Sequence, residues 1–203
     1  KFRNSGQTCV CTNRFIVQSG IYEAFVEKFT AAVAALKVGN GLDAGTVQGP
    51  LIEEKAVAKV ESFVADATSK GGRVTTGGAR HALGHGFFQP TVIRDATTDM
   101  KFAQDEIFGP VAPLFRFDTE EEAVAIANGS PYGLAGYFYT RDLGRAFRLA
   151  EKLKFGQIGV NESVLTTEVA PFGGVKDSGF GREGSKYGLD DYLDVKYVCI
   201  GGL

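Results

Sequence analysis

The chain has 203 residues, of which 44% are hydrophobic and 11% aromatic, and 22 Lys and Arg against 24 Asp and Glu give a net charge of −2. A chain of this length buries roughly 70% of the surface that its unfolded form exposes, so we expect one domain with a hydrophobic core that needs no disulfides. The charges are interspersed and no apolar run approaches a membrane span, which argues against binding to nucleic acid or insertion into a membrane.

Cysteine and histidine are both scarce. The three cysteines, Cys9, Cys11 and Cys199, do not make a disulfide framework, and their odd number suits a reducing compartment. The two histidines, His81 and His85, lie in a Gly-rich stretch away from the cysteines. Zinc and related metals need several such ligands at suitable spacing, so the sequence predicts no metal site.

Two amphipathic helices are predicted in the first third of the chain. Residues 14–17 have strand character, and a helix with a regular apolar face then continues until Gly39. A second helix begins after the turn at Gly49 and stops at 70–72. The apolar positions are Ile21, Phe25, Val26, Phe29, Val33 and Leu36 in the first helix and Val57, Val60, Val64 and Ala67 in the second.

Helices and strands alternate through the rest of the chain. Pro113 lies within one predicted strand and indicates an edge position or a bulge, because proline cannot donate a ladder hydrogen bond. Thr119 and Glu122 form a capping box that opens a helix. The alternation predicts an α/β fold with a largely parallel twisted sheet flanked by helices. The predicted strands span 73–76, 87–93, 111–117, 135–139 and 157–160, and a further helix spans 143–153.

The end of the chain has a different character. Residues 192–200 have the composition of a strand but follow a helix-like segment. A lone terminal strand exposes an unpaired edge, so this segment is expected to need a partner.

The strongest chemical signal surrounds Cys9. Residues 2–10 read Phe-Arg-Asn-Ser-Gly-Gln-Thr-Cys-Val. A reactive cysteine needs positive potential or backbone donors, and Arg3 and Gly6 supply a nearby charge and a close backbone approach. An isolated cysteine beside valine is more often a small buried hydrophobic residue. The whole string, however, resembles the cysteine signature of the aldehyde dehydrogenase family, in which an aromatic residue precedes Gly-Gln-x-Cys.

The resemblance extends over essentially the whole chain. Residues 106–110, Glu-Ile-Phe-Gly-Pro, look like the second fingerprint of the family. Residues 132–135, followed by an aromatic strand and Asn161, are similar to the next block, and residues 171–184 resemble the closing block. With four blocks in the family's order, the chain is identified as a member, and the fold of the family's catalytic domain is expected.

The resemblance implies covalent chemistry at Cys9. Its thiolate is expected to attack an aldehyde carbon and form a thiohemiacetal, whose oxyanion is held by donors that include the Cys9 backbone N–H. Hydride transfer to NAD or NADP then leaves a thioester that water hydrolyses. The resemblance places Glu106 on the nicotinamide ribose and Phe108 beside the nicotinamide ring. Without it, Glu106 would be interpreted as an ordinary loop carboxylate.

The resemblance also divides the chain. Residues 1–190 correspond to the catalytic domain and residues 191–203 to an oligomerisation tail that joins a sheet of a neighbouring subunit, so a homodimer or homotetramer is expected. The NAD(P)-binding half, the Glu that activates water and an Asn of the oxyanion hole are absent from this sequence and expected upstream of Lys1. The glycines of 179–184 are not a dinucleotide fingerprint, because no hydrophobic strand leads into them.

Residues 1–4, 10–11 and 184–188 look like those of succinate-semialdehyde dehydrogenases within the family. In that group the Arg six positions before the nucleophile, here Arg3, is expected to grip the substrate carboxylate through its planar fork. The alternative is an ordinary surface Arg. Thr166 lies where this group tends to have Ser, whose small hydroxyl leaves room for a carboxylate. Phe172 is expected to line the substrate channel or, alternatively, to pack in the core.

Several alternatives stay open. Cys11, two positions after the nucleophile, is either an inert buried thiol or a redox partner that forms a disulfide with Cys9. The substrate is succinate semialdehyde or, alternatively, glutarate semialdehyde or another carboxylated aldehyde, since one methylene changes pocket affinity by only ~1–3 kcal/mol. A function of another class is a catalytically silent domain that acts only in assembly or binding, and the isolated fragment is expected to be inactive. The cytoplasm is the expected location, with the mitochondrial matrix as the alternative.

Overall fold

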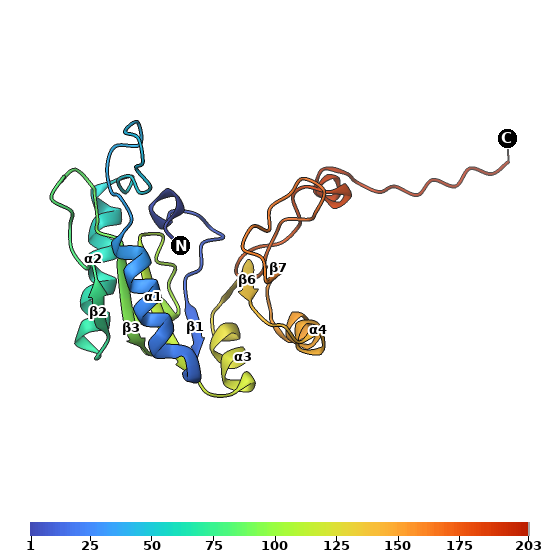
Figure 1. Ribbon diagram of the computed structural model, residues 1–203. Helices are drawn as coiled ribbons and strands as arrows, with labels where there is room; N and C mark the ends of the chain where they lie inside the picture. Colours follow the sequence, from blue (N-terminus) through green and yellow to red (C-terminus); the bar gives the residue numbers. More distant parts are fainter. Residues whose placement is uncertain (203) are drawn as a thin grey trace. The chain divides into compact units, whose positions relative to one another are not determined.

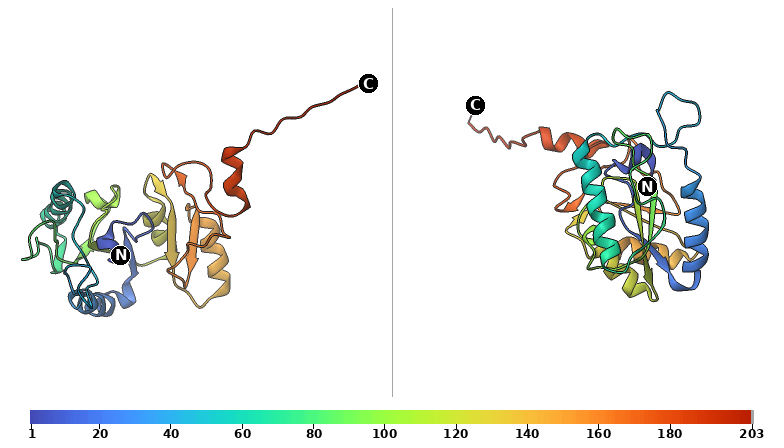
Figure 2. Two further views of the ribbon diagram at one scale, coloured as in Figure 1. Left: turned by 90° about the horizontal axis from the view of Figure 1, so that it is seen from above. Right: turned by 90° about the vertical axis from the view of Figure 1, so that its left-hand side faces the viewer.

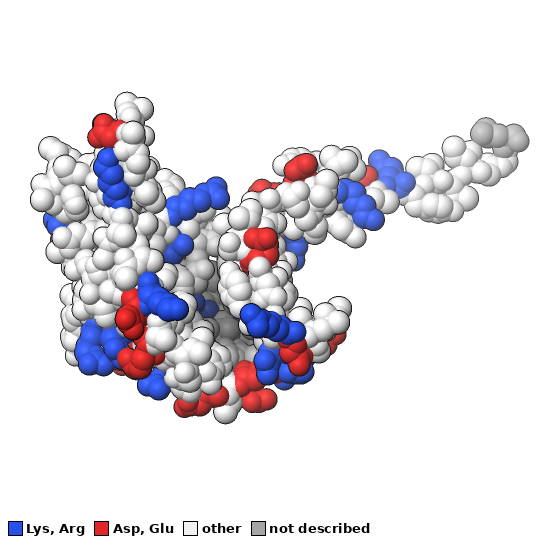
Figure 3. All heavy atoms as spheres, in the orientation of Figure 1, with Lys and Arg blue, Asp and Glu red and all other residues white. Residues whose placement is uncertain are grey.

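The computed structural model describes residues 1–202, and the chain divides into two compact units, Lys1–Ser130 and Pro131–Leu203 (Figure 1). Each unit has sheets and helices of its own. On the face shown in Figure 3, basic and acidic side chains are interspersed and neither kind gathers into a single patch. None of the helices formed by residues 1–202 has the length and apolar character that crossing a membrane requires.

A four-stranded sheet forms the centre of the first unit, in the order β1-β4-β3-β2. β4 (Val111–Phe117) runs parallel to both of its neighbours, β1 (Phe15–Gln18) and β3 (Thr91–Ala96). The remaining strand, β2 (Arg73–Thr76), is antiparallel to β3. The parallel pairings therefore dominate, which confirms the predicted α/β class with a largely parallel sheet.

The helices α1 (Tyr22–Ala34) and α2 (Glu54–Ser69) cover opposite faces of this sheet (Figure 2). Successive residues of a strand point to opposite faces. Val92 accordingly packs in the cluster that contains α1 residues, whereas Ile93 packs in the cluster that contains α2 residues. Each large apolar side chain buried in this way contributes roughly 1.5–3 kcal/mol. The predicted apolar face of α2 is buried throughout, at Val57, Val60, Val64 and Ala67.

The start of α1 differs from the prediction. Ile21, expected on the apolar face, is 58% exposed, whereas its neighbour Tyr22 is fully buried. The Tyr22 hydroxyl donates to the Leu114 carbonyl (3.1 Å) and accepts from the Asp95 N–H (2.8 Å). The buried hydroxyl thus both donates and accepts a hydrogen bond inside the protein. Tyr22 can therefore occupy the core position that the apolar spacing predicted for Ile21.

Two predicted boundaries also shift. The first helix ends at Ala34 rather than Gly39, because the residues that follow form an isolated β-bridge instead. β3 begins at Thr91 rather than Phe87. Pro90 has no N–H to donate, so it separates the strand from the bridge that precedes it.

Pro113 lies in the centre of the sheet rather than at its edge. β4 is paired on both sides, so the edge prediction is wrong, and the irregularity that was the alternative lies in the neighbouring strand, β3. The pairing of β3 with β4 slips between Ile93 and Ala96. Asp95, inside this irregularity, has a φ of 59°, and its N–H bonds to the Tyr22 hydroxyl rather than to the ladder. The slip lets a strand whose proline lacks an N–H occupy a central position.

The last helix of the first unit, α3 (Glu120–Asn128), begins with the predicted capping box. The Thr119 hydroxyl accepts from the Glu122 N–H (3.2 Å), and the Glu122 carboxylate accepts from the Asp118 N–H (2.8 Å). Both interactions satisfy donors that the first helical turn would otherwise leave unpaired, as the spacing predicted.

The second unit contains two two-stranded sheets. β6 (Ala135–Phe138) pairs in parallel with β7 (Gln157–Val160), and β5 (Tyr132–Gly133) pairs antiparallel with β8 (Val175–Lys176). Helix α4 (Leu143–Lys152) connects β6 to β7. The two strands and the helix predicted in this half of the chain are thereby confirmed.

After the 3-10 helix Lys186–Tyr192, the described residues form no regular secondary structure. The strand predicted over 192–200 is therefore not formed within the chain, and its apolar side chains, such as Val195 and Tyr197, are exposed. A strand requires a hydrogen-bonding neighbour. Pairing of this segment with another subunit stays a prediction.

Candidate active site

Cys9 lies on an exposed turn. The Cys11 N–H donates to the Thr8 carbonyl (2.9 Å) and closes a turn that holds Cys9 near its tip. The Cys9 side chain is exposed, its thiol is free, and within residues 1–202 no hydrogen bond engages its backbone N–H. A thiol nucleophile requires an accessible sulfur and a donor for the oxyanion it creates, and this turn offers both.

The residues that precede this turn adopt a strained left-handed conformation. Asn4, Ser5 and Gly6 have φ values of 51°, 57° and 76°, and each non-glycine residue in that region costs roughly 1–2 kcal/mol. The Asn4 amide donates to the Gln7 carbonyl (3.0 Å), and the Ser5 hydroxyl donates to the Gly49 carbonyl (2.7 Å). Strain that surrounding contacts enforce in this way is typical of functional sites.

The Cys9 segment packs directly against the loop 106–110. A Cβ placed on Gly6 would lie 2.1 Å from the Gly109 carbonyl oxygen, so the two backbones touch where only glycine fits. Two blocks that are about half of the chain apart in sequence are therefore in contact within one unit. The segment of the predicted nucleophile and the predicted cofactor loop are therefore in direct backbone contact.

Glu106 and Phe108 both present their side chains to solvent. The Glu106 side chain is exposed, and within residues 1–202 no ion pair engages it. Phe108 is 39% exposed and has a φ of 48°, a conformation that is unfavourable for an aromatic residue. The contacts expected for these two side chains, with a nicotinamide ring and the hydroxyls of its ribose, stay a prediction.

A half-buried ammonium group lies near both blocks. Burial lowers the pKa of Lys1 to about 8, while the Cys11 thiol and the Glu106 carboxylate oppose this shift. Lys1 therefore loses its charge at a lower pH than an exposed lysine does. The position of this charge was not predicted from the sequence.

Sequence reasoning also missed Asn13. Its amide nitrogen donates to the carbonyls of Phe102 (3.0 Å) and Asp105 (3.1 Å), and its amide oxygen accepts from the Ile107 N–H (2.9 Å). These partners are backbone groups 89, 92 and 94 residues away. No local pattern marks such contacts, so only the folded chain reveals them.

Arg3, the predicted carboxylate ligand, is exposed at the start of the 3-10 helix Arg3–Gly6. No ion pair engages its guanidinium in the described part of the chain, so its fork is available to an anion. Cys11 is half-buried, with its sulfur 4.0 Å from the Arg3 carbonyl oxygen, and it is not bonded to Cys9. A redox role for Cys11 stays a prediction.

Thr166 and Phe172, the other predicted substrate residues, line one pocket of the second unit with a volume of about 370 Å³. Phe172 is half-buried, and reciprocal backbone hydrogen bonds with Glu183 (2.8 and 2.7 Å) fix its place. The amide nitrogen of Gln157, which also lines the pocket, is buried and has no hydrogen-bond partner in residues 1–202. The structure thus brings two of the three predicted substrate residues together, while Arg3 belongs to the first unit.

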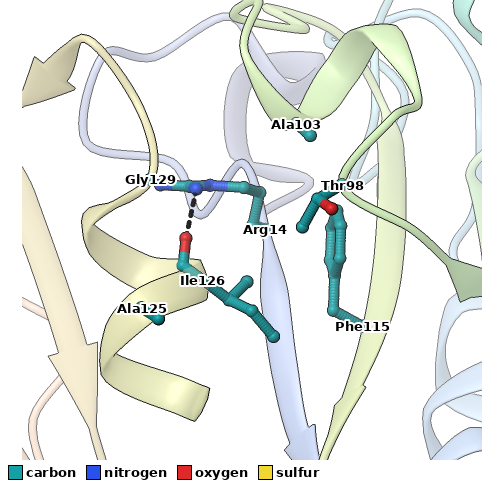
Figure 4. A pocket seen from close by; sticks show the side chains of 7 residues that line it. All are labelled: Arg14, Thr98, Ala103, Phe115, Ala125, Ile126 and Gly129. Atoms are coloured by element: carbon teal, nitrogen blue, oxygen red, sulfur yellow. Dashed lines mark hydrogen bonds between the residues drawn. The ribbon is translucent and has the colours of Figure 1, made fainter. Parts of the chain in front are cut away.

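A second pocket, in the first unit, lies beside Arg14 and has a volume of about 230 Å³ (Figure 4). The guanidinium donates to the carbonyls of Ile126 (2.6 Å) and Ala127 (2.8 Å) at the end of α3, and burial lowers the pKa of Arg14. Because its donors cap a helix, Arg14 is a structural residue rather than an anion ligand. Among residues 1–202, no three His, Cys, Asp or Glu side chains are grouped so as to hold a metal ion.

Comparison with known proteins agrees with this arrangement of sequence blocks. Residues 1–198 match the model of the aldehyde dehydrogenase family. Relatives include a 3-sulfolactaldehyde dehydrogenase of Pseudomonas putida (58% identical), a succinate semialdehyde dehydrogenase of Acinetobacter baylyi (59%) and a glutarate-semialdehyde dehydrogenase of Pseudomonas aeruginosa (58%). Each match covers all of this chain and 42% of the relative, so the chain spans less than half the length of these proteins.

Solved structures give the same result. Succinate-semialdehyde dehydrogenase from Burkholderia pseudomallei matches with a TM-score of 0.96 and 58% identity, over 98% of this chain and 42% of that one. A betaine aldehyde dehydrogenase mutant from Staphylococcus aureus, solved in complex with NAD⁺, matches with a TM-score of 0.90 and 40% identity, over 95% of this chain and 40% of that one. The chain belongs to the aldehyde dehydrogenase family.

Proposed function

We propose that this chain supplies the Cys9 nucleophile and part of the cofactor site of an NAD(P)-dependent dehydrogenase that oxidises succinate semialdehyde to succinate. One observation carries the proposal: an exposed free thiol on a turn whose segment packs against the loop of Glu106 and Phe108. Because the chain spans only 42% of its relatives, the activity proposed is that of the whole protein.

The reaction proposed for Cys9 is acyl transfer through sulfur. The thiolate attacks the aldehyde carbon, and the backbone N–H of Cys9, which no other described group engages, donates to the oxyanion. The nicotinamide cofactor, when bound, supplies the hydride acceptor. Oxidation of the thiohemiacetal leaves a thioester on Cys9, and water attacks that thioester to release the acid and regenerate the thiol.

Glu106 and Phe108 are the residues proposed to hold the cofactor. The exposed carboxylate of Glu106 is suited to accept hydrogen bonds from ribose hydroxyls. Phe108 offers a partly exposed ring on a strained backbone. The NAD⁺ complex of the betaine aldehyde dehydrogenase relative supports a nicotinamide cofactor. The choice between NAD and NADP is left to measurement.

Arg3 is proposed to bind the acidic end of the substrate. Succinate semialdehyde, glutarate semialdehyde and 3-sulfolactaldehyde, named for three relatives, all carry an anionic group in addition to the aldehyde. A guanidinium without an intramolecular ion pair presents two parallel N–H donors to a carboxylate or sulfonate. Thr166 and Phe172 are proposed to line the substrate channel, which their common pocket supports.

Replacement of Arg3 tests the substrate assignment. In the protein that carries this sequence, Arg3→Ala is expected to raise KM for succinate semialdehyde about 10- to 100-fold, because a charge-assisted bidentate contact is lost. KM for an uncharged aldehyde of similar length should change little. Arg3→Lys keeps the charge without the fork and should give an intermediate value. Equal losses on both aldehydes would remove the carboxylate-binding role from Arg3.

Glutarate semialdehyde is the second candidate substrate, because one relative of 58% identity is named for it. Its additional methylene is worth only ~1–3 kcal/mol in a pocket, so the sequence discriminates poorly between the two substrates. Comparison of kcat/KM for semialdehydes of the two chain lengths decides the matter. A higher kcat/KM for the longer substrate would replace the succinate assignment.

Assembly into a homodimer or homotetramer is also proposed. The tail after Tyr192 is exposed and carries apolar side chains at Val195, Tyr197 and Ile200. Addition of such a segment to a sheet of another subunit would cover these side chains and its free backbone groups. Removal of residues 191–203 should therefore lower the mass measured by sedimentation. An unchanged mass would exclude the tail as the assembly element.

A further inference from the structure

We propose that Asn13 is a positioning residue that sets where Glu106 stands relative to Cys9. The inference rests on the proposed function, because it takes Cys9 as the nucleophile and Glu106 as a cofactor ligand. Asn13 lies four positions after Cys9, in the segment that leads into β1. It is therefore carried by the same short stretch of chain as the nucleophile.

All of the contacts that Asn13 makes through its side chain go to the strip of backbone around Glu106. The amide nitrogen uses its two hydrogens on the Phe102 and Asp105 carbonyls, and the amide oxygen accepts from the Ile107 N–H. Asp105 and Ile107 are the two residues on either side of Glu106. An amide that donates twice and accepts once fixes both peptide units next to the glutamate, which a hydroxyl or carboxylate cannot do.

The Cys9 segment consequently holds the loop at two points. Gly6, on one side of Cys9 in sequence, touches the Gly109 carbonyl, and Asn13, on the other side, binds the backbone at 102–107. These attachments tie the segment that carries the thiol turn to the loop that carries Glu106. Fixed spacing matters, since a misplacement of about 1 Å in a reacting arrangement costs roughly 100-fold in rate.

Arg14 is the matched control for this role. It is the next residue, and its side chain also donates two hydrogen bonds to backbone carbonyls, but those carbonyls belong to the end of α3 rather than to the Glu106 loop. Arg14→Ala should therefore lower the melting temperature as Asn13→Ala does. It should do so without releasing residues 102–107.

The experiment compares Asn13→Ala, Asn13→Asp and Arg14→Ala in the whole protein. Four quantities are measured: melting temperature, hydrogen exchange of a peptide covering 101–108, the rate of Cys9 alkylation by iodoacetamide, and the dissociation constant for NAD⁺ or NADP⁺. Asn13→Ala should speed exchange in this peptide, change the alkylation rate and weaken cofactor binding about tenfold, the loss expected when one hydrogen bond to a carboxylate fails. Asn13→Asp removes both donors and should behave like Asn13→Ala.

Equal exchange of the 101–108 peptide in Asn13→Ala and wild type would overturn the inference. So would a cofactor loss in Arg14→Ala that matches the loss in Asn13→Ala at the same melting temperature, since the effect would then be one of stability alone. If the wild type binds neither cofactor and oxidises no aldehyde, the proposed function fails instead. Exchange and alkylation still decide the role of Asn13 in that case.

Discussion

The two units of the chain differ in how far they bury their apolar side chains. Lys1–Ser130 contains every buried hydrophobic side chain found in residues 1–202, divided between the two faces of its sheet. Among the described residues of the second unit, 131–202, the buried positions are glycines, and large apolar side chains such as Phe147, Val169 and Phe180 are exposed. Both units contain helices and strands with regularly spaced apolar residues. Only in the first unit do these side chains form a buried core.

The comparison shows that a regular helix or strand does not by itself stabilise the fold. Helix α4 of the second unit has a capped start and a strong apolar face, but none of its residues is buried. Secondary structure of this kind contributes little stability until its apolar face is covered. The turn of Cys9 and the loop of Glu106, the proposed site, both lie in the unit that has a core, and a rigid core can hold such a site in a fixed geometry.

The largest expected effect comes from separating the units. Residues 1–130 expressed alone should unfold cooperatively, because their clusters lie within this segment. Residues 131–203 alone should show no cooperative transition, since they bury no large apolar side chain. Denaturant titration followed by circular dichroism measures both. A cooperative transition in the second fragment would mean that the contrast between the units has been overstated.

Replacement of Gly6 tests whether the first unit is packed as closely at the candidate site as in its core. Gly6→Ala introduces a Cβ 2.1 Å from the Gly109 carbonyl oxygen at a residue whose φ is 76°. Overpacking and the left-handed backbone together should lower the free energy of unfolding by about 3 kcal/mol and displace the Cys9 turn. Gly41→Ala is the control, because nothing lies within 4 Å of its added Cβ. Equal stabilities of the two variants would mean that the contact is not close.

Asp66 supports the start of the loop that leads to Glu106. Its carboxylate accepts from the Lys101 N–H (2.8 Å) and pairs with Lys70 (3.0 Å), and the Lys101 N–H, followed by Lys70, lowers the pKa of Asp66 below its ordinary value of 3.8. A lowered pKa stabilises the fold above that ordinary value and ceases to do so as the pH falls through the lower one. Asp66→Asn should therefore cost about 1 kcal/mol at neutral pH.

The same variant provides the pH test. The stability difference between wild type and Asp66→Asn should shrink as the pH falls below 3.8 toward the lower native pKa, because Asp66 then binds a proton in the unfolded chain more readily than in the folded one. Urea titrations at neutral and acidic pH measure it. A difference that stays constant down to the lowest pH at which the protein is folded would exclude the charge of Asp66 as its cause.

Replacement of Cys11 is expected to have the smallest effect on turnover. The hydrogen bond that its half-buried sulfur makes to the Arg3 carbonyl is long (4.0 Å), so Cys11→Ser should keep nearly full activity under reducing conditions. If Cys11 is the redox partner of Cys9, the variant should also lose reversible inactivation by mild peroxide. Peptide mapping of the oxidised wild type checks this role. The lack of a linked Cys9–Cys11 peptide would leave Cys11 as an inert thiol.

Sequence patterns predicted the elements better than the contacts between them. The face of α2, the cap at Thr119 and the strands at 73–76 and 157–160 follow from local spacing, and all are confirmed. The position of Pro113 was predicted in part, because proline signals a bulge but does not tell which strand bears it.

In the candidate site, too, sequence patterns predicted the residues better than the contacts between them. The family motifs led to the prediction of Cys9 and Glu106 as site residues, but they gave no sign of the close approach of Gly6 to Gly109 or of the hydrogen bonds made by Asn13. Each of these contacts joins a side chain or a missing side chain to backbone about 90 or more residues away. Hydrogen bonds to backbone carry no requirement on the identity of the partner residue, so no sequence pattern records them.

The exposed sulfur of Cys9 is expected to become acylated during turnover. Rapid acid quench of the whole protein with succinate semialdehyde and nicotinamide cofactor, followed by peptide mass spectrometry, tests it directly. A succinyl thioester is expected on the peptide that contains Cys9, with neither acylation nor turnover in Cys9→Ala. Turnover that persists in Cys9→Ala, or an acyl group on another residue, would contradict it.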